Sequence, residues 1–555
     1  MNIKIEGKSA ELISGKGLYS YISELGLDSD DLRLKPLAAM LGGEIFNLSF
    51  VPKRECEFRL IRYSDDEGRR VYERTLRFVL ILAVRRLLPS ARVIVQYSMG
   101  QGVYITISKE GDGQLTDEDV SMLKKEMEFI TSSAFKLYRS RRSINEAVER
   151  FSSDGQLDKV KLLSWRNFSY FDLYSCPDYS DYVDYFYGEM TLDTSYVSIF
   201  DLHRIDDSVV LLLPDVDDCS RAAAFEDSPK LLAVFGQSDR WGRLMGCARA
   251  AELNERVADG SIRELIRVNE ALHEKVFSRT ADEVISCGAK AVMIAGPSSS
   301  GKTTSANRIA TQLRASGLDP IMLSLDDYYI DRDLIERDEN GEIDLEHINT
   351  IDTARFSRDL SLLIDGEEVS LPRFNFLTGK REEGFRTLKL HSDQPLIIEG
   401  LHALNPLLLG DIPHDRIYRV YVSALTTLNL DDHNRIRTAD LRLLRRLVRD
   451  YRTRGASMEQ TLSMWASVRR GESRWIFPFQ ENADCIINTT LHYEAAVLKK
   501  YVHPLLQEVP IESPYYTQAR SIVKYLNYFV SADVEDEIPP TSILREFIGG
   551  NTFYR

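Results

Sequence analysis

Two hydrophobic patterns divide the chain. From about residue 288, short and nearly continuous apolar runs alternate with amphipathic segments. The apolar runs are AVMIAG, PIMLSLDD, PLIIEGLHAL, RIYRVYVS and ADCIIN. Strands of this kind are buried on both faces, as in a parallel sheet that helices cover on each side. The pattern predicts an α/β domain with a doubly wound parallel sheet.

The N-terminal half has a mixed pattern. Residues 1–60 alternate short apolar runs with turns, which predicts a small β-rich module. Residues 69–88 carry apolar side chains at helical spacing, and the runs ARVIVQYSM and GVYITIS after Pro89 predict two strands. Thr116, followed by acidic residues, predicts the N-cap of another helix. Residues 262–287 are expected to form a long amphipathic helix that leads into the α/β domain.

Length and composition narrow the class of protein. A chain of 555 residues predicts about three compact units. Its net charge of −15 argues against broad, sequence-independent nucleic-acid binding. The six cysteines are scattered without a CxxC pair, which favours reduced thiols and no zinc ribbon. No N-terminal apolar segment and no membrane-length apolar span are present, so we expect a cytoplasmic protein without membrane attachment.

A phosphate-binding motif stands between the first apolar run and an amphipathic segment. The motif GxxxxGK[ST] is matched at every fixed position. With the next threonine, the expected ATP-binding residues are Gly296, Pro297, Ser298, Ser299, Ser300, Gly301, Lys302, Thr303 and Thr304. Lys302 is expected to bridge the β- and γ-phosphates, and the Thr303 hydroxyl to bind Mg²⁺. The structural alternative is a flexible Gly/Ser turn.

Carboxylates follow two of the predicted strands. Asp326 and Asp327 end the run PIMLSLDD, where α/β folds present catalytic side chains. A carboxylate there can orient an attacking hydroxyl and accept its proton. Glu399 ends the run PLIIE and is expected to bind Mg²⁺. Turn capping is the structural alternative at both places.

An arginine-rich segment interrupts the acidic composition. Residues 435–474 contain eleven arginines, no lysine and four acids. Arg442, Arg445, Arg446 and Arg449 share helical spacing, and Arg452 and Arg454 follow. Guanidinium groups suit polyphosphate oxygens, so we expect a mobile lid over the transferring phosphoryl group. A solvated helix face is the alternative.

Taken in order, these motifs resemble the uridine kinase/phosphoribulokinase family. The resemblance rests on GPSSSGKTT, SLDDYY, LPRFNF, IIEGLHAL, RRLVRDYRTRG and ADCIIN, and it covers about residues 285–510. It implies an ATP- and Mg²⁺-dependent phosphotransferase with an alcohol acceptor. By this resemblance, Asp326 would be the catalytic base beside a nucleoside 5′-hydroxyl. The other implied positions are Tyr329 in the acceptor pocket, Glu346 at the ribose hydroxyls, Phe374 on the base, Arg446 at the acceptor, and Arg449 and Arg454 at ATP phosphates.

Two departures leave the acceptor open. Uridine kinases usually read PxYDFxxHxR, and Gly379 stands at the position of that histidine. Ala456 stands where an arginine often follows Arg454. A site without the polar partner loses one way of reading the base. The acceptor is therefore a nucleoside of the uridine or cytidine type or, alternatively, a sugar, a polyol or a pantothenate-like alcohol. The motifs do not fix the preferred nucleotide donor.

The whole chain resembles a longer bacterial group that has a threonyl-tRNA-synthetase-like N-terminal region. Residues 1–60 resemble a TGS-type module, and residues 70–140 resemble the second additional domain of threonyl-tRNA synthetase. The HxxxH pair of that domain would fall on Arg74 and Phe78, neither of which is a zinc ligand. We therefore expect no tRNA editing chemistry. An ATP-gated RNA- or tRNA-binding regulator remains the alternative from another class.

These expectations divide the chain into five parts. They are a TGS-like module (1–62), a threonyl-tRNA-synthetase-like α+β unit (63–200), an α/β connecting region (201–284), a P-loop uridine kinase-like domain (285–510) and a C-terminal helical extension (511–555). The expected partner is a small-molecule acceptor. Assembly into a homo-oligomer stays open.

Overall fold

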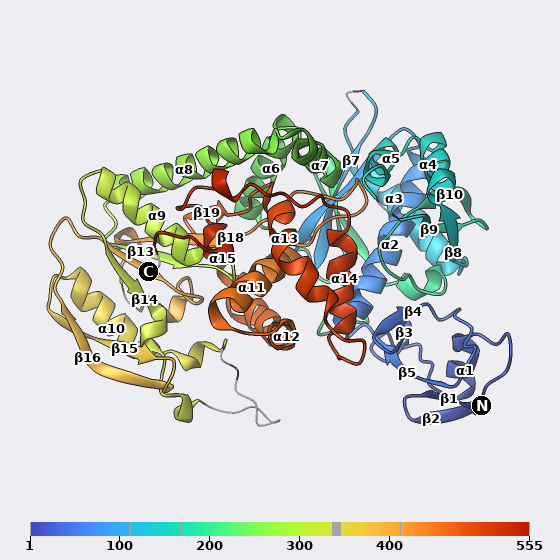
Figure 1. Cartoon of the computed structure of the whole chain (residues 1–555), viewed down its shortest axis with the longest axis horizontal. Helices are drawn as coiled ribbons and strands as arrows, with labels where there is room; N and C mark the ends of the chain where they lie inside the picture. The colour runs from blue at the N-terminus through green and yellow to red at the C-terminus, as the bar shows by residue number, and fades with distance from the viewer. Residues whose placement is uncertain are drawn as a thin grey trace.

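The computed structural model describes residues 2–111, 113–166, 168–335, 344, 346–410 and 412–553. The parallel sheet of the C-terminal half (291–488) and the N-terminal module (2–61) lie at opposite ends of the molecule, with α11 (Thr438–Arg454), α13 (Glu494–Gln507) and α14 (Tyr516–Leu526) between them (Figure 1). Among the described residues, no helix combines the length and the apolar character that a membrane crossing requires.

The N-terminal module is a five-stranded sheet with one helix. Its elements are β1 (Asn2–Ile5), β2 (Lys8–Glu11), α1 (Leu18–Glu24), β3 (Ala38–Leu41), β4 (Glu44–Phe46) and β5 (Cys56–Ile61), and the strand order is β2-β1-β5-β3-β4. Ile3 and Ile5 are fully buried, whereas Asn2 and Lys4 between them are exposed. This alternation is typical of a strand with one buried face. The predicted β-rich character is confirmed.

The second unit combines two sheets with four helices. Its elements are α2 (Asp66–Leu87), β6 (Arg92–Met99), β7 (Gly102–Ser108), α3 (Asp117–Ser132), β8 (Tyr138–Ser143), α4 (Ile144–Ser153), α5 (Leu157–Leu163), β9 (Tyr170–Cys176), β10 (Ser180–Asp184), β11 (Asp201–Ile205) and β12 (Ser208–Leu212). Thr116 caps α3 as expected, because its side chain accepts the Asp119 N–H. The sheet β11-β12-β7-β6 crosses residue 200. The structure therefore places the end of this unit after β12, beyond the boundary expected at residue 200.

Three helices connect the two halves. They are α6 (Pro229–Leu244), α7 (Ala250–Asp259) and α8 (Ile262–Cys287). Helix α8 has the bounds expected from the sequence and runs along the upper edge of the molecule toward the parallel sheet of the C-terminal half (Figure 1). It ends at Gly288, whose φ of 69° is the left-handed conformation that favours glycine after a helix.

The C-terminal half contains the predicted parallel sheet. Its strands are β13 (Ala291–Ala295), β14 (Ile321–Ser324), β17 (Leu396–Glu399), β18 (Ile417–Ser423) and β19 (Cys485–Asn488), in the order β14-β17-β13-β18-β19, and every pairing is parallel. Val292 and Ile294 belong to one hydrophobic core, and Met293 and Ala295 belong to another. The central strand is thus buried on both faces, as a doubly wound sheet requires.

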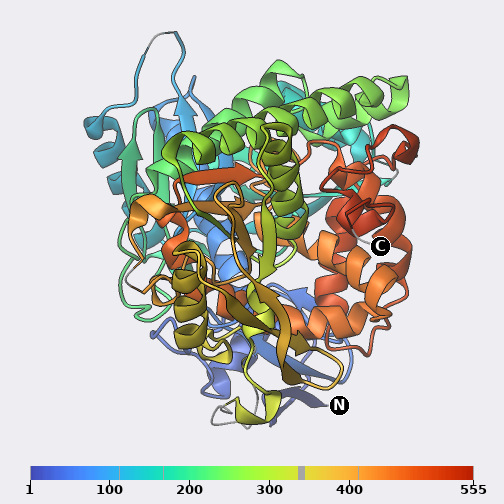
Figure 2. The same cartoon turned by 90° about the vertical axis from the view of Figure 1, so that its left-hand side faces the viewer.

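The remaining elements surround this sheet. They are α9 (Lys302–Ala315), α10 (Thr353–Ile364), the hairpin β15 (Val369–Asn375) and β16 (Lys380–Leu388), α11 (Thr438–Arg454), α12 (Met458–Trp475) and α13 (Glu494–Gln507). In Figure 2, where the left-hand side of Figure 1 faces the viewer, the hairpin and α10 lie in front. Helix α9 follows the phosphate loop directly and packs on α8 and on β17.

The C-terminal segment returns to both halves. It contains α14 (Tyr516–Leu526) and α15 (Arg545–Ile548). The Thr517 hydroxyl on α14 donates to the carbonyl of Gly43 in the N-terminal module. Helix α15 packs on α11, and its residues Phe547 and Ile548 are buried in the same core as α9 and α13. The segment is therefore an integral part of the fold.

Candidate active site

The phosphate loop has a backbone that its sequence explains. It joins the end of β13 to the first turn of α9. Gly301 has a φ of 88°, and Ser299 adopts a φ of 58°, which is uncommon outside glycine. A Cβ atom at Gly296 would lie 2.0 Å from the Val422 carbonyl oxygen, so only glycine fits there. The loop N–H groups and the N-terminus of α9 provide the geometry that binds a phosphate.

Buried ion pairs hold this loop. The Ser298 N–H donates to Glu472 Oε1 (3.0 Å), and Arg442 donates to the Ser298 carbonyl oxygen (3.0 Å) and to Glu472 Oε2 (2.7 Å). The Arg442 and Glu472 side chains are 1% and 0% exposed. Arg445 is also fully buried and pairs with Glu494 (2.6 Å). Because each buried charge has a counter-charge and hydrogen bonds, the loop rests on a fixed support.

The predicted arginine stripe therefore has two parts. The expectation of a mobile lid, and the alternative of a solvated face, are wrong for Arg442 and Arg445, since both are buried and paired with carboxylates. Arg446 reaches the loop from the same helix and donates to Ser298 Oγ (2.8 Å). Arg449 and Arg454 pair with Asp450 (2.9 and 3.5 Å), and the Arg454 side chain is 59% exposed.

Parallel strand register brings the predicted carboxylates to the phosphate loop. Strand β17 lies between β14 and β13, and Glu399 is paired with Ser324 on one side and with Ile294 on the other. Asp326 follows β14 within a 3-10 turn, Leu325–Tyr328. Since all three strands end at the same edge, Asp326 and Glu399 lie beside the loop that follows β13.

The charges of this group interact. Burial raises the pKa of Asp326, and the nearby Lys302 charge partly opposes that rise. Burial, together with the Asp326 charge, raises the pKa of Glu399 to about 7, while Lys302 and a hydrogen bond from Thr303 lower it. The Thr303 and Glu399 oxygens are thus adjacent, and oxygen ligands of this kind fit Mg²⁺. The structure brings Lys302, Thr303, Asp326 and Glu399 together.

The residues predicted for the acceptor side lie around the same carboxylates. Burial, with the Glu472 charge, raises the pKa of Glu346 to about 7, and the Arg446 and Lys302 charges oppose the rise. The buried Tyr329 hydroxyl has a raised pKa because of burial and of the charges of Asp326, Glu346 and Glu399. The Tyr329 and Phe374 rings are 5.5 Å apart between centroids. Tyr329 therefore links the aromatic side of the site to its carboxylates.

Gly379 forms the turn of the hairpin β15–β16. Its φ is 69°, and its N–H donates to the Asn375 carbonyl oxygen (2.8 Å). A Cβ atom there would lie 3.1 Å from Arg332 Cβ and 3.3 Å from Arg332 Nε. The position thus suits glycine for its backbone, and the Arg332 side chain lies where a substituent would project.

Three functional candidates were missed by the sequence reasoning. Glu472 holds the phosphate loop, and Glu546 of α15 accepts the Thr304 hydroxyl (2.6 Å). His402 is 1% exposed, and its ring nitrogens make no hydrogen bond of good geometry among the described residues, although the Glu346 backbone lies near the ring. Burial lowers the pKa of His402 to about 4, so the ring is neutral. Only the position of His402, three residues after Glu399, gave a signal in the sequence.

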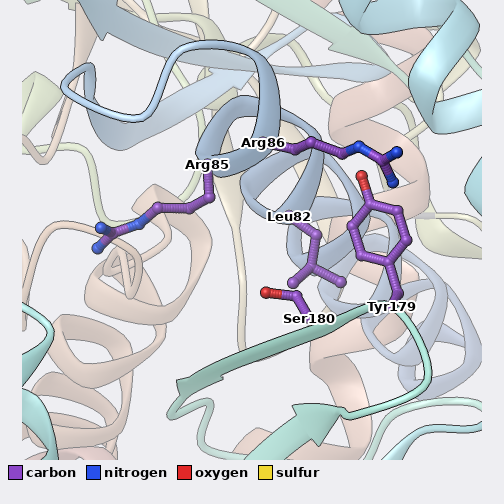
Figure 3. Close-up of a pocket in the computed structure, with 5 residues that line it drawn as sticks. All are labelled: Leu82, Arg85, Arg86, Tyr179 and Ser180. Carbon is purple, nitrogen blue, oxygen red and sulfur yellow. The ribbon is translucent and has the colours of Figure 1, made fainter.

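Among the described residues of the N-terminal half, the positions Arg74 and Phe78 have structural contacts only. Phe78 is fully buried beside Phe186, and Arg74 donates to the Glu189 carbonyl oxygen. A cavity of about 260 Å³ lies farther along α2 and is lined by Leu82, Arg85, Arg86, Tyr179 and Ser180. Arg85 and Arg86 point in opposite directions there, and Arg86 lies along the Tyr179 ring (Figure 3). None of the predicted site residues lines this cavity.

Comparison with known proteins agrees with this geometry. Residues 291–494 match the model of the phosphoribulokinase/uridine kinase family. A uridine kinase of Staphylococcus aureus (strain JH9) is 32% identical over 195 residues, which cover 35% of this chain and 84% of that protein.

Two further matches cover different parts of the chain. A threonine–tRNA ligase of Finegoldia magna is 28% identical over 203 residues of the N-terminal region, and the match spans 37% of this chain but only 31% of the ligase. The solved D-glycerate 3-kinase of Cryptococcus neoformans is 16% identical, covers 49% of this chain and 87% of that chain, and has a TM-score of 0.21. Through the domain that carries the phosphate loop, the chain belongs to the phosphoribulokinase/uridine kinase family of P-loop kinases.

Proposed function

We propose that this P-loop kinase transfers the γ-phosphoryl group of ATP to the 5′-hydroxyl of a nucleoside of the uridine or cytidine type. The observation that supports this most strongly is the position of Asp326, at the end of the strand two places from β13 and within the electrostatic influence of Lys302. A carboxylate beside the phosphate loop can orient an incoming hydroxyl toward the phosphoryl group.

The donor side has residues that fit a nucleoside triphosphate. Residues Gly296–Thr304 would hold the phosphates through their N–H groups, and Lys302 would offset the charge of the β- and γ-phosphates. Thr303 and Glu399 would hold Mg²⁺ through adjacent oxygens. The ion, when bound, neutralises charge that develops on the phosphate oxygens. Arg449 and Arg454 lie farther along α11 and would meet ATP phosphates after release from Asp450.

The acceptor side has the groups that a ribose and a base need. Asp326 would accept the hydrogen bond of the 5′-hydroxyl, and Glu346 would accept those of the ribose hydroxyls. Phe374 and Tyr329 offer ring faces for the base, since aromatic stacking suits any base. Arg446, held at Ser298, would contact the acceptor next to the transferred group.

A non-nucleoside alcohol is the second candidate, and one observation favours it. Gly379 has no side chain to read a pyrimidine edge, and Arg332 occupies the adjoining space. A sugar, a polyol or a pantothenate-like acceptor needs hydroxyl-binding groups such as Glu346 but no base reader.

An acceptor screen separates the two candidates. Release of ADP from MgATP is measured with uridine, cytidine, purine nucleosides, sugars, polyols and pantothenate. We expect uridine or cytidine to accelerate ADP release, and 5′-deoxyuridine, which lacks the reacting hydroxyl, to bind without turnover. Acceleration by a sugar or polyol, with nucleosides inactive, would establish the second candidate instead.

A further inference from the structure

The loop between β18 and α11 joins the two halves of the molecule. Residues 424–436 are buried almost without interruption, although they include Asn429, Asp431, Asp432 and His433. Polar side chains at this depth need partners. Most of those partners come from residues 73–250, which lie outside the kinase domain in the sequence.

Part of the loop pairs with the second unit through its backbone and through arginines. The Val95 N–H donates to the Asp432 carbonyl oxygen (2.8 Å), and Asn429 Nδ2 donates to the Val95 carbonyl oxygen (2.8 Å). Arg92 and Arg249 both bind the Asp432 carboxylate, at 2.8 and 2.6 Å. This stretch is therefore tied to β6 and to the start of α7.

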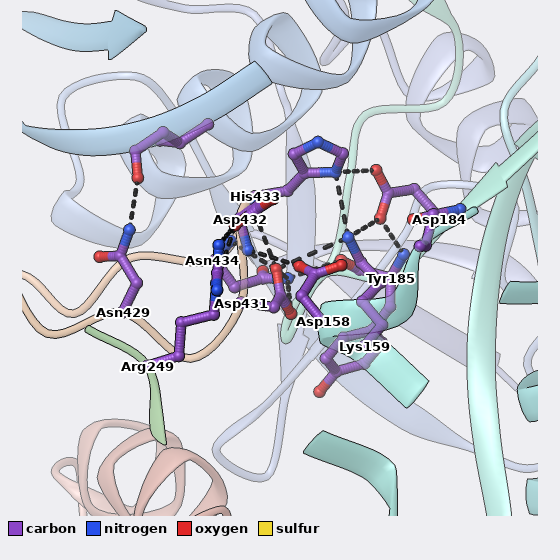
Figure 4. A network of polar contacts seen from close by, with 12 residues as sticks. Asp158, Lys159, Asp184, Tyr185, Arg249, Asn429, Asp431, Asp432, His433 and Asn434 are labelled. Atoms are coloured by element: carbon purple, nitrogen blue, oxygen red, sulfur yellow. Dashed lines mark hydrogen bonds and ion pairs between the residues drawn. The ribbon is translucent and has the colours of Figure 1, made fainter. Parts of the chain in front are cut away.

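A buried ionic cluster fixes the next residues of the loop (Figure 4). His433 Nδ1 is 2.7 Å from Asp184 Oδ2 and 3.0 Å from Lys159 Nζ. Lys159 lies 3.1 Å from Asp184 and 3.6 Å from Asp431. Figure 4 shows the His433 ring, the Lys159 amine and the Asp184 carboxylate in mutual contact. Buried groups joined in this way resist displacement, because each would be left uncompensated if the others moved.

Glu73 of α2 holds the end of the loop. Its carboxylate binds Arg435 (3.0 Å) and Arg437 (2.5 Å), and Arg77 lies 3.6 Å away. Burial alone would raise the pKa of Glu73, but these three guanidinium charges hold it well below its usual range. Arg437 is the residue immediately before α11. Glu73 thus fixes the point at which α11 begins.

From that point, α11 leads directly to the phosphate loop. Arg442 is five residues beyond Arg437, or about 7 Å along the helix, and it binds the Ser298 carbonyl oxygen. Arg446, one turn later, binds Ser298 Oγ. A second contact, Arg70 to Asp440 (3.0 Å), joins α2 to the first turn of the same helix.

We propose that Glu73 is a positioning residue for the kinase: through Arg435 and Arg437 it sets the place of α11, and thereby the conformation of the phosphate loop at Ser298. The N-terminal half is then a working part of the nucleotide site. This inference rests on the kinase activity and on MgATP as donor, and it does not depend on which acceptor is used.

The test measures MgATP affinity by calorimetry in the full chain. Glu73→Gln removes the charge that binds Arg435 and Arg437, and we expect the Kd for MgATP to rise roughly 2- to 30-fold, the range of long-distance coupling. Glu73→Asp keeps the charge and should restore part of the affinity. Asp119→Asn is the matched control, because Asp119 is a similarly buried acid of the same half that binds Lys109 and Thr116.

The inference requires that the variants differ in MgATP affinity even where they lose similar stability. Both Glu73→Gln and Asp119→Asn should lower the Tm, but only Glu73→Gln should weaken MgATP binding. Arg70→Gln, at the partly exposed contact with Asp440, should weaken binding in the same direction and decides the matter if Glu73→Gln does not fold. Native MgATP affinity in the folded α2 variants would overturn the inference, whatever acceptor the screen identifies.

Discussion

The donor and acceptor sides of the site differ in how their buried carboxylates are satisfied. On the donor side, Arg442 and Arg445 are paired with Glu472 and Glu494, and the pairs also bind the phosphate loop or the strand end beside it. On the acceptor side, Glu346 forms no ion pair among the described residues, and its Oε2 atom is buried without a hydrogen-bond partner, as are both His402 ring nitrogens. The donor side also contains unpaired atoms, namely Ser299 Oγ, Ser300 Oγ and Arg442 Nε, but its two buried carboxylates are satisfied. Unpaired buried groups carry a desolvation cost that paired groups do not.

This difference indicates which side of the site already has its binding geometry before a ligand binds. The donor side is preorganised, because buried ion pairs hold its phosphate loop in place before a nucleotide binds. The acceptor side retains unused hydrogen-bonding capacity, which a hydroxyl-bearing acceptor can satisfy. Changes on the donor side should therefore affect stability and nucleotide binding, and changes on the acceptor side should affect chemistry and acceptor affinity.

The sharpest test of the acceptor side is Asp326→Asn. We expect kcat to fall on the order of 10³-fold, because the amide cannot accept the proton of the acceptor hydroxyl. MgATP affinity should stay near that of the native chain. The matched control is Asp327→Asn, one residue away, for which kcat should change by only a few-fold. Equal losses in the two variants, measured as initial rates of ADP release, would remove the special role of Asp326.

The donor side is tested by Glu472→Gln. The substitution leaves Arg442 buried without its full counter-charge, so we expect the free energy of unfolding to fall by about 3–5 kcal/mol, together with weaker MgATP binding. Glu459→Gln, on the first turn of the same helix, should cost less than about 1 kcal/mol. Denaturant unfolding and calorimetry measure both quantities.

A double variant sharpens that result. Arg442→Met with Glu472→Leu replaces the buried ions by apolar groups of similar size, and much of the lost stability should return. MgATP affinity should remain low, because the Ser298 N–H and carbonyl groups still lack their partners. Full recovery of affinity would mean that the pair supports only the fold.

The sequence predicted the parts of the site that depend on local pattern. The phosphate loop, the strand ends at Asp326 and Glu399, and helix α8 follow from motifs and periodicity within a few residues. The partners of the arginines do not, because Glu472 lies 30 residues from Arg442 and Glu494 lies 49 residues from Arg445. Helical spacing showed that these arginines share a face but not that the face is buried.

No local sequence pattern predicts the contacts between residues that are far apart in the chain. Glu546 reaches Thr304 across 242 residues, and Glu73 reaches Arg437 across 364. Strand β12 pairs antiparallel with β7 across about 100 residues, and β11 pairs with β12, so this sheet extends past the boundary expected at residue 200. Pairings of this kind are decided by the packed fold, since no local preference distinguishes one distant partner from another.

The raised pKa of Glu346 gives a stability test of the acceptor side. Its pKa of about 7 exceeds the ordinary value of 4.5, so between these values the folded chain binds more protons than the unfolded chain. The stability contributed by the protonated carboxyl is therefore present below about pH 4.5 and is lost as the pH rises through 7. The loss should approach about 3 kcal/mol. In Glu346→Gln this part of the pH dependence should vanish, as measured by denaturant unfolding from pH 5 to pH 8; an unchanged slope would contradict the burial of an uncompensated carboxyl.

The smallest expected effect concerns His402. It shows whether the unpaired ring nitrogens of His402 bind the acceptor or simply stay without a hydrogen bond. His402→Leu removes a neutral ring whose two nitrogens have no partner among the described residues, so the variant should be as stable as the native chain or slightly more stable. If the acceptor satisfies His402, the KM for the acceptor found in the screen should rise about 10-fold, the cost of one lost hydrogen bond in a buried site, while the KM for ATP stays constant. Ala466→Leu, at an exposed residue of α12, provides a control for the added apolar side chain. An unchanged KM for the acceptor, with a raised Tm, would show that His402 destabilises the fold without binding the acceptor, and the contrast between the two sides would then rest on Glu346 alone.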